Sequence, residues 1–132
     1  MITILNQLLE AEKAGVLTLD FLKKEYTQVE LPFNEIKEDE AWSVAGLIAS
    51  IKRENGVVST ATGDFLDKVK VKDGLIQRLE LLNKGQGWVA RKIDDLLAMD
   101  IQQETRDFLT EMKVKHLENI QACENYLENI KK

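Results

Sequence analysis

Residues 5–12 read Leu5-Asn6-Gln7-Leu8-Leu9-Glu10-Ala11-Glu12. The second and third leucines follow the first by three and four residues, which places all three on one face of an α-helix. Val16 and Leu19 continue this apolar face. We therefore predict an amphipathic helix over residues 3–26, ended before Leu31-Pro32, where proline cannot continue a helix.

The same spacing recurs along the rest of the chain. It predicts long helices at residues 34–55, 74–99 and 101–130, with a short helix at residues 64–71. Asn34 is a candidate N-cap of the second long helix, and Gly56 is its stop signal. Asp100-Ile101-Gln102-Gln103 resembles a capping box at the start of the last helix.

The lengths of the connections predict how these helices pack. Short connections at residues 28–33 and 99–101 make the first and second helices, and the third and fourth, antiparallel neighbours. Residues 57–73 can span a 22-residue helix, which is roughly 33 Å long. Two helical hairpins joined by a long central crossover form a ferritin-like, up-down-down-up four-helix bundle. We expect one such all-α domain over residues 1–132.

Composition excludes several classes of function. The chain of 132 residues carries 23 acidic and 18 basic side chains, a net charge of −5 that disfavours nucleic acid and anionic membranes as partners. One cysteine and one histidine exclude a disulfide framework and any site that needs two imidazoles from one chain. No apolar run has the length of a membrane span, and no basic leader is seen, so we expect a cytoplasmic protein.

Each long helix carries one polar residue within its apolar face. These residues are Glu12, Glu40, Gln86 and His116. Three lie near the middle of their helices and Glu40 lies somewhat nearer the start of its helix, so antiparallel packing should bring the four toward one layer of the core. Burying two carboxylates costs several kcal/mol each unless they are neutralised, paired or bound to a cation.

Four segments carry a resemblance to a known family. They are residues 5–15, 39–42 (Asp39-Glu40-Ala41-Trp42), 62–65 (Thr62-Gly63-Asp64-Phe65) and 81–89. Together they resemble a small bacterial branch of the ferritin-like superfamily, a domain of unknown function. The wider superfamily holds a di-iron centre with one carboxylate from each of two helices and a Glu-x-x-His pair from each of the other two.

The resemblance implies a degenerate version of that centre. Glu12 and Glu40 match the carboxylates of the first and second helices, and His116 matches the histidine of the fourth. Three positions depart from the pattern: Ser43 replaces a histidine, Gln86 replaces a carboxylate, and Lys113, beside the remaining ligands, replaces a glutamate. A complete di-iron site is therefore not expected.

Two interpretations of the remaining residues stay open. In the first, Glu12, Glu40 and His116 form a metal-free polar cluster in which the imidazole donates to a carboxylate, and the protein is a non-enzymatic interaction or structural protein. In the second, the three side chains hold a single Fe, Mn or Zn ion, since one imidazole and two carboxylates suit these metals. The protein would then have a mononuclear or incomplete di-iron site with iron- or redox-related activity.

Trp42 and Trp88 fall outside the inner helix faces. Large exposed aromatics often mark an interface, which favours a homodimer. The alternative is that the crossover covers them through Phe65 or Val69. Gly85-Gln86-Gly87 lacks the third glycine and the preceding strand of a dinucleotide-binding loop, so it indicates a kink, a π-bulge or a close helix approach.

Overall fold

The computed structural model describes residues 1–131, and in this part of the chain all regular structure is helical. Its helices are α1 (Ile2–Glu25), α2 (Phe33–Arg53), α3 (Phe65–Lys70), α4 (Gly74–Leu97) and α5 (Gln103–Ile130). The predicted all-α class is confirmed, and the helix bounds differ from the predicted ones by a few residues. Among the described residues, no helix combines the length and apolar character needed to cross a bilayer.

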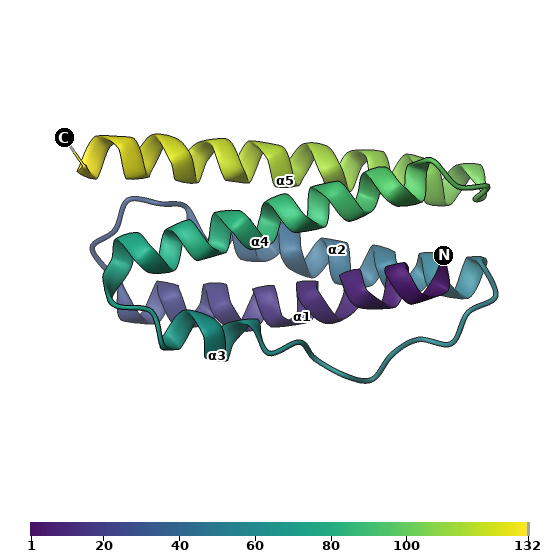
Figure 1. Ribbon diagram of the computed structural model, residues 1–132, viewed down its shortest axis with the longest axis horizontal. Coiled ribbons are helices and arrows are strands. Elements are labelled where there is room, and N and C mark those ends of the chain that lie inside the picture. The colour runs from purple at the N-terminus through teal and green to yellow at the C-terminus, as the bar shows by residue number, and fades with distance from the viewer. Residues whose placement is uncertain (132) are drawn as a thin grey trace.

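The four long helices lie side by side and form two hairpins (Figure 1). Short turns join α1 to α2 and α4 to α5, and the two hairpins touch through α2 with α5 and through α1 with α4. The segment after α2 returns along the length of α1 before the short helix α3, which packs against α1 and α4 (Figure 1).

The apolar core is divided into two clusters. The first contains Leu5, Leu8, Leu9, Leu47, Ile51, Val89, Ile93, Leu96, Ile101, Leu109 and Met112. The second contains Leu19, Leu22, Leu31, Phe33, Ile36, Val69, Leu79, Leu82, Cys123 and Leu127. On every long helix the division falls at the polar residue that the sequence singled out: Glu12, Glu40, Gln86 or His116. A buried polar layer thus separates two apolar halves.

The crossover is fixed to a polar stripe on the outer side of α1. The Asn6 amide donates to the Val57 carbonyl (2.9 Å) and accepts from the Ser59 amide (2.8 Å). The Ser59 hydroxyl donates to the Glu10 carboxylate at 2.7 Å, and the Lys13 ammonium donates to the Ser59 carbonyl at 3.1 Å. These bonds satisfy backbone groups of a segment that has no regular structure of its own.

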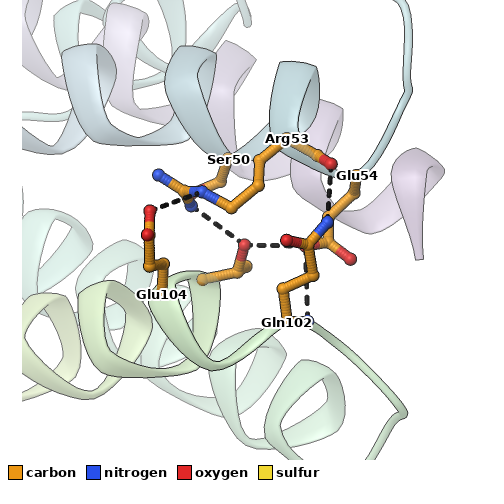
Figure 2. A network of polar contacts seen from close by, with 6 residues as sticks. Ser50, Arg53, Glu54, Gln102 and Glu104 are labelled. Atoms are coloured by element: carbon orange, nitrogen blue, oxygen red, sulfur yellow. Dashed lines mark hydrogen bonds and ion pairs between the residues drawn. The ribbon is translucent and has the colours of Figure 1, made fainter.

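A second polar network joins the end of α2 to the start of α5 (Figure 2). The buried Thr105 hydroxyl donates to Glu54 (2.8 Å) and accepts from the Arg53 guanidinium (3.0 Å). Arg53 also pairs with Glu104 at 3.1 Å, and the Gln102 side chain donates to the Arg53 carbonyl at 2.8 Å. The network holds the two hairpins together at this end of the bundle.

Both capping predictions were wrong. Asn34 lies inside the first turn of α2, where it accepts a hydrogen bond from Lys23, and it does not cap the helix. The stretch from Asp100 forms no capping box, and the side chain of Gln102, the residue before α5, makes no capping hydrogen bond. Instead the Glu54 carboxylate, from the end of α2, accepts from the Gln102 backbone amide at 3.4 Å and places negative charge near the N-terminus of α5.

Both tryptophans are half-buried within one chain. Trp42 packs against the Phe108 ring at 5.0 Å between centroids. The Lys115 ammonium lies 4.9 Å from the centroid of the Trp42 ring. Trp88 lines a cavity together with Phe65 of α3. Both tryptophans are thus partly covered within one chain, and the homodimer stays a prediction.

The Gly85 backbone allows a close approach between helices. A Cβ atom there would lie 3.0 Å from the Phe65 ring. The predicted close helix approach is therefore confirmed, and α4 runs through this point as α-helix without a π-bulge.

Candidate metal centre

Three side chains meet in the polar layer, each from a different helix. Glu12 of α1, Glu40 of α2 and His116 of α5 are 2%, 3% and 1% exposed. One ligand atom from each lies within 4.8 Å of the other two. His116 Nε2 is 2.6 Å from Glu12 Oε1 and 3.8 Å from Glu40 Oε2. The structure thus brings together the three residues that the sequence proposed as ligands.

The orientation of the imidazole decides which nitrogen faces the carboxylates. His116 Nδ1 lies 2.9 Å from the Met112 carbonyl oxygen, one turn earlier on α5. A carbonyl can only accept, so Nδ1 carries the hydrogen. In the neutral ring Nε2 then presents its lone pair to Glu12 and Glu40. A histidine that ligates a metal is commonly oriented by such a bond from its other nitrogen.

The two carboxylates are costly to ionise where they lie. Burial raises the pKa of Glu12 from 4.5 to about 7, although hydrogen bonds with Glu40 and Ser43 oppose the change. Burial, and then the charge of Glu12, raise the pKa of Glu40 well above its usual value. A divalent cation would supply the positive charge that two adjacent buried carboxylates lack.

Gly15 provides space for one of the ligands. A Cβ atom at this position would lie 3.1 Å from the Glu40 carboxyl carbon, which is tighter than ordinary packing. Gly15 follows Glu12 by three residues, on the face of α1 that meets α2. Sequence reasoning missed it, and the available signal was a glycine inside a strongly periodic helix, where its low helix propensity requires a reason.

The departures from the di-iron pattern have clear structural positions. Lys113 points away from the cluster, because its ammonium is 2.6 Å from the Asp94 carboxylate and the side chain is partly exposed. The expectation that this lysine lies beside the ligands was wrong. Ser43 is buried, and its hydroxyl donates to the Asp39 carbonyl at 2.9 Å. Gln86 is buried in the layer, and neither amide atom has a hydrogen-bonding partner among the described residues.

A cavity of about 420 Å³ reaches the carboxylates from the side where α3 covers the bundle. Its lining includes Glu12, Glu40 and Gln86, together with residues of α1, α3 and α4. The donor set fits a single borderline divalent ion, because one imidazole nitrogen and two carboxylate oxygens can bind it and leave further coordination positions open. Glu12 Oε1 and His116 Nε2 face each other at 2.6 Å, and Glu40 Oε2 has no hydrogen-bonding partner among the described residues.

The fold and this cluster define an all-helical protein with a buried Glu-Glu-His group that could hold a metal ion. The chain belongs to the family described as a domain of unknown function (DUF6306), whose sequence model matches residues 1–125. No curated protein matches the chain, and no solved structure matches it either.

Proposed function

We propose that this protein binds one divalent transition-metal ion, Fe(II), Mn(II) or Zn(II), between Glu12, Glu40 and His116. The observation that carries the proposal is that two carboxylates lie beside His116 Nε2, while the other ring nitrogen, Nδ1, is hydrogen-bonded to a backbone carbonyl. All three groups are buried, so the carboxylates need a compensating charge. The metal-bound interpretation supplies that charge, and the metal-free one must retain protons instead.

The proposed setting is a ferritin-like, up-down-down-up bundle. The support is the chain order: two hairpins are linked by a crossover that runs back along α1, so α2 and α4 point in the same direction (Figure 1). Bundles of this kind place metal ligands on facing helices in the core. The cluster has that placement, with ligands from α1, α2 and α5.

We propose one ion and a role in holding the core, without di-iron chemistry. A second ion would need ligands where the chain has the amide of Gln86 and the hydroxyl of Ser43. Lys113 pairs with Asp94, so His116 is the only ligand that α5 offers. The ion would instead link the two hairpins across the polar layer, because His116 belongs to one hairpin and the two glutamates belong to the other.

One distance favours the metal-free interpretation as a second candidate. Two ligands of one ion, bound at about 2.0–2.2 Å each, lie about 3.0–3.5 Å apart. Glu12 Oε1 and His116 Nε2 are 2.6 Å apart, which suits a proton shared between them. In that case the cluster is a polar core element, and the protein is the structural or interaction protein that the sequence first suggested.

Melting temperatures separate the two candidates. The protein is stripped with a chelator and melted with and without Mn(II), Zn(II) or anaerobic Fe(II), in parallel with Glu12→Gln, His116→Gln and the exposed control Glu118→Gln. Metal at 100 times its dissociation constant should stabilise the parent and the control by about 2.7 kcal/mol, because it binds the native state only. The Glu12 and His116 variants should gain little. If metal does not change the melting temperature of the parent, and Glu12→Gln is more stable than the parent, the metal-free interpretation is correct.

A further inference from the structure

We propose that the cavity between α1, α3 and α4 binds a small neutral planar molecule with an aromatic body and a carboxamide-like edge. This goes beyond the proposed metal ion and does not require it. Three properties of the cavity point to such a ligand: the size and apolar character of its walls, the unpaired amide of Gln86, and the sign of the charges that surround it.

The walls suit a small apolar body. The cavity of about 420 Å³ falls within the range of small-molecule sites. Phe65 of α3 and Trp88 of α4 contribute aromatic side chains, and Ala11, Leu82 and Val89 contribute aliphatic ones. The Phe65 ring lies directly over Gly85, so this wall has little freedom to collapse into the space.

Gln86 supplies the specificity. It lines the cavity, it is 3% exposed, and its Nε2 and Oε1 atoms both lack a hydrogen-bonding partner among the described residues. A buried amide without partners is unfavourable, and a ligand that offers one acceptor and one donor side by side satisfies both atoms at once. A carboxamide has that edge. A hydrocarbon of the same shape leaves the amide unpaired.

The charges around the cavity exclude an anion. Its lining contains the carboxylates of Glu10, Glu12, Glu40 and Asp64 and one ammonium, that of Lys68, which lies 3.5 Å from Asp64. An added negative charge would be repelled whether or not a metal neutralises the two inner carboxylates. A cationic amidinium would be attracted, but it has only donors and cannot accept from Gln86 Nε2. The neutral amide alone satisfies both conditions.

Three molecules of one shape test this directly: benzamide, benzoate and benzamidine. Each is titrated into the ¹⁵N-labelled full-length chain with a chelator present, while side-chain amide and indole resonances are followed by NMR. Benzamide should shift the Gln86 side-chain amide and the Trp88 indole signals and should bind at least tenfold more tightly than the other two. Gln86→Leu should weaken benzamide at least tenfold, and the matched change Gln121→Leu, on the exposed face of α5, should not.

Several results would overturn the proposal. They are no benzamide binding, binding that Gln86→Leu leaves unchanged, or benzamidine as the tightest ligand in both the parent and the variant. The Gln86 amide shift in the parent does not depend on any variant folding. Because the titration is done without metal, its failure leaves the metal site untouched, and a failed metal titration leaves this site untouched.

Discussion

Replacing Glu12 by glutamine should stabilise the metal-free protein, and the gain should grow with pH. The change keeps the shape of the side chain and its capacity to hydrogen bond, and it removes a group that is costly to ionise in the core. Burial raises the pKa of Glu12 from 4.5 to about 7 in the folded chain. The folded state therefore holds this proton more tightly than the unfolded state, so the parent loses stability as pH rises from 4.5 to about 7.

The size of the effect follows from that difference in pKa. Each unit corresponds to about 1.4 kcal/mol, so the full penalty on the parent is about 3 kcal/mol above pH 7. At about pH 5 the penalty on the parent is only about 1 kcal/mol. Below pH 4.5 both states are protonated, and this group contributes nothing. The Glu40 carboxyl adds in the same direction, because the charge of Glu12 helps to raise its pKa.

Urea unfolding in the presence of a chelator, at about pH 5 and pH 8, measures both quantities. The advantage of Glu12→Gln over the parent should increase by about 2 kcal/mol or more between the two conditions. Glu118→Gln, on the exposed side of α5, should show no such increase. If the difference in unfolding free energy between Glu12→Gln and the parent is the same at both pH values, the reasoning is refuted. Ionisation of Glu12 would then not cost stability in the core.

Three further substitutions test other parts of the structure. Gly15→Ala should preserve or raise stability in chelator through its helix propensity, which urea unfolding measures. It should also lower metal affinity about tenfold, because its methyl group displaces the Glu40 carboxylate, and calorimetric titration with metal measures this change. Thr105→Val should destabilise by about 1–3 kcal/mol in urea unfolding, because it breaks the buried hydrogen bonds to the end of α2. Gly46→Ala should cost about 1–3 kcal/mol in the same assay, since its methyl group meets the Phe108 ring; unchanged stability would contradict the packing there.

Much of the fold could be predicted because its determinants are local in sequence. Long periodic segments specified the helices, and a polar residue at the centre of each apolar face specified the layer. Glu12 was predictable for this reason: it lies between Leu9 and Leu19 on a face that is otherwise apolar and buried. A carboxylate in that position is removed from water, so its ionised form is unfavourable whatever the details of the packing.

The parts that failed depend on partners far away in the chain. The predicted capping box of α5 is absent, and the Gln102 amide before α5 instead donates to Glu54, at the end of α2 and about 50 residues earlier in sequence. The polar stripe of α1, at Asn6, Glu10 and Lys13, has the pattern of a solvated face, but it holds the crossover. Lys113 has the spacing to reach the cluster, yet Asp94 of α4 draws it outward. Spacing along one helix gives the direction of a side chain and not the identity of its partner.

X-ray diffraction from crystals grown with one equivalent of Zn(II), recorded at the zinc absorption edge, tests the central claim most directly. We expect one strong anomalous peak inside the bundle, about 2.0–2.2 Å from a carboxylate oxygen of Glu12, a carboxylate oxygen of Glu40 and Nε2 of His116. Zinc bound only at surface carboxylates, with His116 Nε2 and Glu12 still in direct contact in the core, would contradict the account.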